Sequence, residues 1–577
     1  MRDYFEAEIR LLHESAQAFA RQHPEQAGML NLSELRDRDP YIERLLEGMA
    51  YLTAQIRQHI DDDIPEISEA FLNHLWPRFL RAYPSATVVQ FLHRLGQLQQ
   101  SQELPSGTGL LSPPVGDDQV ICRFATMDSV MLHPLRVQKV ELEEPPGSGT
   151  RIRVSVQLDA GIEVADLELE ELKFYLHADP AVALWLLHQL TAGLHGLRVS
   201  FHDHPTRNPH ELDPTGDVVL SHLAGEGLPG DEDEGRFPGF RLLHDYFCFR
   251  EKYNFVTVGG LDGIVWPDRC SGFDLEFTVK APPPQDHAIG RDTFRVHCAP
   301  AVNLFRQEAE PIYLNHRRVS YPVIADIGAR DGVRVHRVDK VTGVNMATGV
   351  RHDYSPMSSF RHRRQGGRFF YTSSRQLGGE HPELFLSVGG SELPARETLS
   401  CEVTANNGDY PRRYLSENGL STPPSGFPSY ASFRNLTRPT KLYEPPERKQ
   451  FRWELISHLS LNFTSLGEPG VVQRILQMYE WTGEEQNQRR IDAISDVELE
   501  PVQQVRRGAL MRGVQVRLHV DEKGFRSLSD IYLFGCVLHR FFSMYAALNC
   551  FVETAIRCYP SQEEMKWQPL LGENFPI

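Results

Sequence analysis

The chain has 577 residues, of which 41% are hydrophobic and 24% charged, and its formal net charge is −17 at pH 7. A single hydrophobic core stops growing at about 250–300 residues, so this length predicts several domains. The negative charge repels phosphate backbones, which argues against nucleic acid as a partner.

The cysteines and the first residues indicate the compartment. Eight cysteines are scattered without a C-x-x-C pair, mostly inside apolar runs. This pattern is typical of reduced, buried thiols and argues against a disulfide framework. The opening residues, Met-Arg-Asp-Tyr-Phe-Glu-Ala-Glu, lack the apolar segment of a signal peptide. We therefore expect a cytoplasmic protein.

The first 85 residues are expected to be helical. An apolar stripe with four-and-three spacing predicts an amphipathic helix over residues 3–23, packed on its own body or on a partner helix. Its members are Phe5, Ile9, Leu12, Ala16 and Phe19. A second helix is predicted to begin at Asp39-Pro40, because Asp is a good N-cap and Pro suits the first turn. One of its faces carries Ile42, Leu45, Leu46, Met49, Leu52 and Ile56.

Residues 86–240 and 241–420 are predicted to form two β-rich domains, because short apolar runs alternate with turn residues. The expected strands are Val88–Leu92, Val120–Phe124, Leu135–Leu142, Arg151–Leu158, Leu167–Leu176, Phe255–Val258, Phe273–Val279, Val333–Val341, Leu384–Val388 and Leu399–Ala405. Helices are predicted from Asp179-Pro180 to Leu194 and at Arg241–Tyr253. Residues 201–240 are expected to be mainly loop.

The apolar stretch from Phe294 to Phe305 lies in the middle of the predicted core. It begins as a strand, which Pro300 is expected to end because proline has no N–H to donate. A buried asparagine must bond its amide to a partner. Asn303 is therefore predicted to fix the chain where it changes direction.

Three neighbouring histidines, His202, His204 and His210, provide an alternative function. Two histidines one residue apart on a strand are compatible with a zinc site, as in a metal-dependent hydrolase. Neither a nearby cysteine nor an H-E-x-x-H helix supports this interpretation, so loop histidines are favoured. We expect no catalytic, metal or cofactor-binding residues.

The last third of the chain begins with a boundary. Dense proline and serine over residues 421–450 predict an extended arm lying on a surface. Residues 451–577 are predicted to form an α+β domain containing the apolar segment Ile531–Leu548. Arg540 inside that segment is costly in lipid, so we expect a buried helix and no membrane span.

This segment is apolar nearly all round, and we therefore expect other chains to cover part of it. The C-terminal candidates for core or interface positions are Trp453, Leu538, Phe541, Phe542 and Tyr545.

Several segments resemble, in order and spacing, the motifs of TssF, a baseplate subunit of the bacterial type VI secretion system. The segments are Phe19–Ala27, Asp39–Gly48, Leu242–Phe247, Cys298–Phe305, Trp453–Phe463 and Leu538–Phe551. The resemblance implies a multidomain α+β fold like a phage baseplate wedge protein, without catalytic activity or cofactor.

The resemblance also implies partners. Members of this family assemble in the cytoplasm with TssG, in wedges that hold two copies of TssF. TssK docks on the wedge and links it to the inner-membrane complex. The wedges surround the VgrG hub, and TssE connects them to the contractile sheath.

Overall fold

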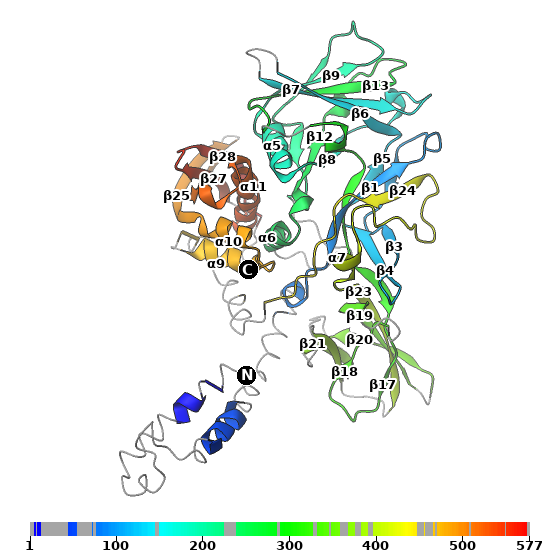
Figure 1. Cartoon of the computed structure of the whole chain (residues 1–577), viewed down its shortest axis with the longest axis vertical. Coiled ribbons are helices and arrows are strands. Elements are labelled where there is room, and N and C mark those ends of the chain that lie inside the picture. The colour runs from blue at the N-terminus through cyan, green and yellow to red at the C-terminus, as the bar shows by residue number, and fades with distance from the viewer. Residues whose placement is uncertain are drawn as a thin grey trace. The chain divides into compact units, whose positions relative to one another are not determined.

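The structure is a computed structural model in which the chain divides into two compact units, Met1–Leu75 and Trp76–Ile577. Helices and many short strands are combined, in agreement with the α+β prediction (Figure 1). The residues described are 5–6, 8–12, 44–54, 72, 77–144, 149–223, 238–284, 289–326, 332–345, 348–357, 367–375, 382–390, 396–446, 455, 466–467, 470–506, 509–548 and 550–573.

The first sheet joins strands from distant parts of the sequence. Its order is β24-β1-β15-β4-β3, and a separate pair is formed by β2 and β5. The bounds are β24 Ala431–Asn435, β1 Ala86–His93, β15 Cys298–Val302, β4 Val120–Thr126, β3 Gly109–Val115, β2 Gln102–Leu104 and β5 Val130–Leu132. Phe91 of β1 is paired with Phe433 of β24, and both are buried in one apolar cluster. Part of the predicted arm is thus an edge strand that contributes to the core.

Pro300 does not end a strand, contrary to the prediction. It lies inside β15 opposite Val88, and its carbonyl accepts the N–H of Met127 at 2.8 Å. The ladder between β15 and β4 is formed by Ala301 and Val302. Pro300 precedes this ladder, so its missing N–H leaves the ladder intact. The break in the chain lies instead at His297, whose φ is +59°.

Two further sheets and two helices follow, with orders β10-β9-β13-β7-β6 and β11-β12-β8-β14. The bounds of the first are β10 His210–Leu212, β9 Leu194–Phe201, β13 Gly272–Val279, β7 Thr150–Leu158 and β6 Leu135–Glu143. Those of the second are β11 Val218–Leu220, β12 Phe255–Val258, β8 Leu172–Leu176 and β14 Phe294–Arg295. The helices are α5 (Pro180–Thr191) and α6 (Pro238–Cys248), and α5 contacts both sheets.

Two predictions in this region were wrong. β8 begins at Leu172, five residues later than expected, because a short 3-10 helix, Val164–Asp166, and bends precede it. The presumed loop after residue 201 contains β10 and β11, whose three residues each are too few to show a period of two.

The largest sheet has the order β16-β23-β19-β20-β21-β22-β18, with β17 paired to β23. The bounds are β16 Phe305–Glu308, β23 Glu397–Asn406, β19 Arg334–Asn345, β20 Arg351–Pro356, β21 Phe369–Arg375, β22 Glu383–Gly389, β18 Tyr321–Pro322 and β17 Ile312–Leu314. Helix α7, Tyr410–Tyr414, follows β23. The first three sheets draw on segments that the predicted boundary at residue 240 separates, and β24 of the first sheet also lies beyond the boundary at residue 420, whereas the largest sheet lies within residues 241–420.

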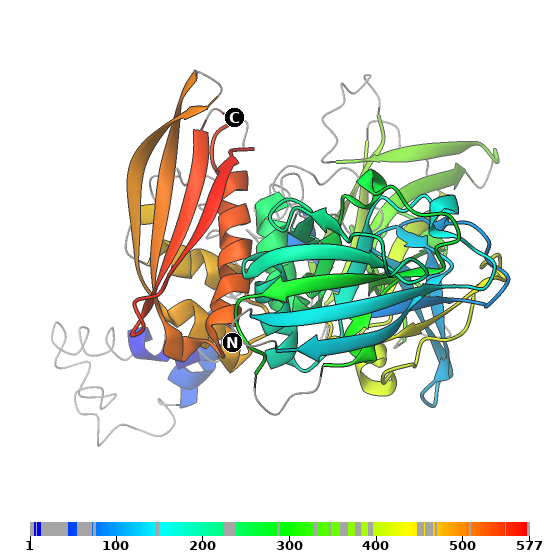
Figure 2. The same cartoon turned by 90° about the horizontal axis from the view of Figure 1, so that it is seen from above.

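The C-terminal sheet has the order β25-β26-β27-β28 and lies along helix α11 (Figure 2). The bounds are α9 Val471–Tyr479, α10 Glu485–Asp492, β25 Ile494–Arg506, β26 Ala509–Asp521, α11 Leu528–Tyr545, β27 Cys550–Tyr559 and β28 Glu564–Leu571. At Gly535 a side chain would collide with the ring of Trp567, so glycine allows β28 to approach the helix closely.

The chain itself buries α11, so the expectation that other chains cover part of it was wrong. The helix contacts α5, α6, β27 and β28, and Leu538 and Phe542 are fully buried. Two helices and a sheet approach it from different directions, which is why an apolar surface nearly all round suits it. No helix within the described ranges is long and apolar enough to cross a membrane.

A buried carboxylate fixes the N-terminal end of α11. Asp530 is fully buried, and its Oδ2 accepts from Arg490 Nη2 of α10 at 3.1 Å, while Arg250 pairs with its Oδ1. Burial alone would raise the pKa of Asp530, but the two guanidinium groups hold it below its usual range. Ser527 caps the helix, and its Oγ accepts the N–H of Asp530. One carboxylate therefore joins three segments.

We predict that Leu538→Asp prevents the isolated chain from folding, because it buries an unpaired charge. Leu538→Met conserves the volume and should cost less than about 1.5 kcal/mol. Solubility and thermal unfolding of the chain expressed alone measure both effects. A Leu538→Asp variant that folds alone but fails to assemble would show that α11 is buried between chains instead.

We predict that Asp530→Asn destabilises the C-terminal domain by roughly 3–5 kcal/mol, since the buried guanidinium of Arg490 and the half-buried guanidinium of Arg250 lose their counter-charge. For a domain of the length predicted for residues 451–577, the melting temperature should fall by at least about 6 °C. Asp496→Asn, at an exposed position of β25, is the matched control and should change stability by less than about 0.5 kcal/mol. Equal melting temperatures for the two variants would contradict the role given to Asp530.

Candidate functional site

The residues chosen from the sequence fall into different environments. Leu538, Phe541 and Phe542 are core residues of α11, and Asn303 is also fully buried. In the first unit the stripe residues Phe5, Ile9 and Leu12 are partly buried. Phe19 and Trp453 lie outside the described residues, as does the side chain of Tyr545, the last residue of α11.

The three histidines of the alternative hypothesis have separate partners. His202 Nε2 lies 2.7 Å from Asp274 Oδ1, while His204 Nε2 bonds to the carbonyl of Asp268 at 2.9 Å. His210 lies on β10, where it pairs with Val199. Within the described ranges, which include all three, no group of three or more His, Cys, Asp or Glu residues could hold a metal ion. The geometry therefore does not support a metal-dependent hydrolase.

A reciprocal pair of amides lies where the first sheet meets the largest sheet. Asn303 Nδ2 donates to Asn407 Oδ1 at 2.8 Å, and Asn303 Oδ1 accepts the backbone N–H of Asn407 at 2.6 Å. Asn303 Nδ2 also donates to the carbonyl of Arg123 at 2.7 Å. The amide of Asn303 thus has the partners that its burial requires, and it fixes the turn between β15 and β16 as predicted.

Asn407 extends this junction in two further directions. Its Oδ1 accepts the N–H of Arg123 at 2.9 Å, and its Nδ2 donates to the carbonyl of Gly332 at 2.8 Å. The sequence predicted that the amide of Asn303 needs a partner, but it did not identify Asn407 as that partner. The sequence feature that could have identified Asn407 is a second asparagine in a turn that follows a buried strand. Four chain segments, those of Arg123, Asn303, Gly332 and Asn407, are joined by these two side chains.

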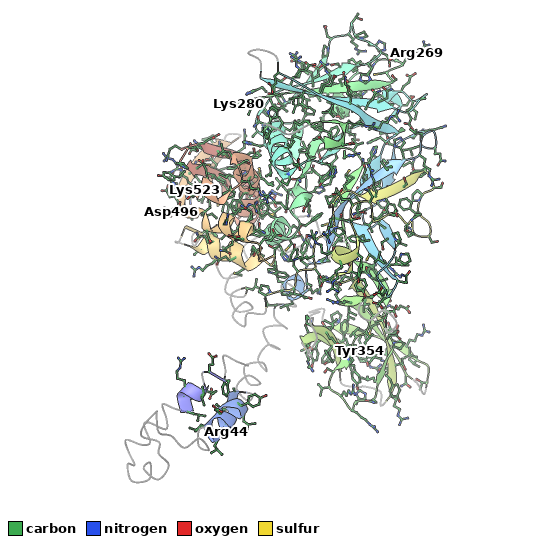
Figure 3. All side chains as sticks on the ribbon, viewed as in Figure 1. Arg44, Arg269, Lys280, Tyr354, Asp496 and Lys523 are labelled. Atoms are coloured by element: carbon green, nitrogen blue, oxygen red, sulfur yellow. The ribbon has the colours of Figure 1, made fainter. Side chains whose placement is uncertain are left out.

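A second buried polar group lies inside the largest sheet, where Figure 3 labels Tyr354. The hydroxyl of Tyr354 donates to Glu397 Oε2 at 2.7 Å, and His352 Nε2 lies 2.5 Å from Oε1. The carboxylate reaches them across Gly343 of β19, where any side chain would collide with it. Burial raises the pKa of Tyr354 and lowers that of His352. A protonated tyrosine and a neutral histidine suit a structural network.

The first unit carries an exposed apolar face on the helical residues 44–54, among which Figure 3 labels Arg44. Leu45, Met49 and Leu52 are 66%, 51% and 59% exposed. Their spacing places them on one side of the helix. The fully buried positions are Ala50 and Ala54 instead. The sequence predicted an apolar face here, and the structure leaves its large side chains uncovered.

Known proteins are similar to this chain over nearly its whole length. The sequence model of the family "Type VI secretion system, TssF" matches residues 1–574. The chain is 29% identical to the type VI secretion system component TssF1 of Pseudomonas aeruginosa strain PAO1, and the match covers 99% of this chain and 98% of that protein.

Solved structures give the same result. One is a chain of the TssK-TssF-TssG baseplate subcomplex of a type VI secretion system, determined by cryo-electron microscopy. It is 32% identical with a TM-score of 0.77, covering 91% of this chain and 98% of that chain. A chain of the type VI secretion system baseplate complex is 31% identical with a TM-score of 0.64, covering 100% and 99%. The chain belongs to the TssF family of type VI secretion system proteins.

Proposed function

We propose that this protein is a structural subunit of a type VI secretion baseplate. The observation that carries the proposal is the likeness to a chain of the TssK-TssF-TssG subcomplex, which extends over nearly the whole of both chains. A likeness of this extent includes nearly the whole fold and is not confined to one domain. The role is assembly and not catalysis, since buried networks such as those of Asn303 and Asp530 suit rigid support.

The proposed partners follow from the family. TssG and a second copy of this chain form the wedge, and TssK is recruited to it. The wedge connects the VgrG hub, through TssE, to the contractile sheath. Assembly takes place in the cytoplasm and ends with docking at the inner-membrane complex.

The exposed face formed by Leu45, Met49 and Leu52 is the structural observation that favours a protein partner. Large apolar side chains that remain exposed along one side of a helix are typical of a surface that another helix covers. A partner that covers these three residues would remove their side chains from water, and each would contribute up to about 1.5–3 kcal/mol. We therefore place a wedge contact on this helix.

We predict that co-expression with TssG of the same bacterium yields a stable complex containing more than one copy of this chain. Size-exclusion chromatography with mass determination measures the composition. The complex should keep the chain soluble, since it covers the exposed apolar face. A well-behaved monomer that does not bind TssG would contradict the proposed function.

We predict that the double variant Leu45→Asp and Met49→Asp weakens this complex at least tenfold, because charges replace the apolar contact. Thr53→Asp is the matched control: it adds a charge at an exposed position of the same helix without removing apolar surface. Circular dichroism of both variants checks that the chain is folded. If the double variant and the control bind equally well, the contact lies elsewhere.

A further inference from the structure

Three buried histidines meet where three sheets adjoin. His93 is the last residue of β1, His133 lies between β5 and β6, and His297 lies between β14 and β15. The ring centroid of His297 is 6.0 Å from that of His93 and 6.1 Å from that of His133. Asp159, at the end of β7, completes the group. We call these four residues the histidine junction.

Hydrogen bonds close the histidine junction into a ring. His93 Nε2 lies 3.1 Å from Asp159 Oδ2, and the Asp159 N–H donates to the carbonyl of Pro134 at 3.0 Å. The next residue back, His133, donates its backbone N–H to His297 Nε2 at 3.2 Å. The carbonyl of His297 then accepts the N–H of Phe91 in β1 at 2.9 Å. Each link joins segments that belong to different strands.

The bond at His297 exists only while its imidazole is neutral. Nε2 accepts an N–H there, so its lone pair must be free and the ring proton must lie on Nδ1. A proton added to Nε2 would face the His133 N–H and break the bond. His297 also holds a left-handed backbone, with φ of +59°, which is strained for a residue other than glycine. Losing the bond removes a restraint on a strained position.

The surroundings provide little room for added charge. The side chains of His93 and Asp159 are 7% and 4% exposed. The groups facing His297 are His133 and His93, both imidazoles, so a second proton would meet a like charge. Burial lowers the pKa of His133 to about 4, and burial with these two neighbours lowers that of His297 well below its usual range. Asp159 Oδ1 is buried without a hydrogen-bond partner, which leaves one acceptor unused.

The sign of the pH effect follows from these directions. In an opened junction the imidazoles of His133 and His297 take up protons below about pH 6.5, whereas the closed junction keeps these two neutral until the pH is much lower. The closed form is therefore fully favoured above about pH 6.5 and loses stability as the pH falls toward about 4. Each neutral imidazole makes opening about tenfold easier at pH 5.5 than at pH 7.5.

We propose that the histidine junction is an acid-sensitive latch between the sheets that contain β1, β7 and β14. It is closed at neutral pH and opens locally on acidification, without unfolding the C-terminal sheet. The histidine junction is a site for protons and not for a metal, because the described residues contain no metal-binding group. The latch goes beyond the proposed assembly role and does not depend on it.

Hydrogen–deuterium exchange of the full chain at pH 7.5 and 5.5, corrected for intrinsic exchange rates, tests the latch. Peptides containing the N–H groups of Phe91 and His133 should lose about 100-fold in protection, corresponding to His133 and His297 together. Peptides from β26 and β27 should keep theirs. Equal protection at both pH values would overturn the proposal, and so would an equal loss throughout the chain.

His297→Asn removes the titrating ring and keeps a residue type that tolerates positive φ. It should lower protection at pH 7.5 and abolish most of the pH response. His133→Gln keeps the backbone donor and should leave a response of about tenfold. His195→Gln, at an exposed position of β9, should respond like the unmodified chain. An unchanged 100-fold response in His133→Gln, or a lost response in His195→Gln, would overturn the assignment.

Discussion

The second unit depends on the position of one short strand, β15. It lies between β1 and β4, although more than 200 residues of sequence separate it from β1. Contacts this far apart require costly loop closure before they contribute stability, so both ends of such a strand must be held firmly. His297 precedes β15 and Asn303 follows it, and the side chains of both bond to backbone groups of other segments. The bonds of His297 therefore hold one end of β15, and the bonds of Asn303 hold the other end.

The sequence predicted the local elements well and their partners poorly. Alternation located β6, β7, β13 and β23 because each presents opposite faces to core and solvent. The prediction missed β25 and β28, although Val497 and Leu499 alternate with charged residues in β25, and Met565 and Trp567 alternate with polar residues in β28. The sequence placed Pro300 at the end of a strand. A strand tolerates a proline where the hydrogen-bond ladder with the neighbouring strand begins after it, as it does here. That information is tertiary, as is the membership of β24 in the first sheet.

The two conspicuous apolar helices show the same limit for surfaces. Helix α11 is apolar nearly all round, and its own chain surrounds it with α5, α6 and two strands. The helix of residues 44–54 carries a narrower apolar face, yet its large side chains are exposed while Ala50 and Ala54 are buried. Hydrophobicity alone therefore does not show which of the two helices exposes its large apolar side chains. Which face is covered depends on the packing of small side chains, which the spacing of large residues does not reveal.

Burying polar groups costs desolvation free energy, and a structural subunit gains a fixed geometry from them. An ion pair or amide network in a core contributes little net stability compared with apolar residues, but it is satisfied in one arrangement only. Asp530 fixes three segments around α11, and the amides of Asn303 and Asn407 fix two sheets. If the segments around Asp530, or the two sheets at Asn303 and Asn407, moved relative to one another, buried polar groups would lose their partners. These groups therefore resist deformation of the fold. Among these groups the histidine junction differs, because acidification below about pH 6.5 weakens its closed form, and rigidity there is conditional.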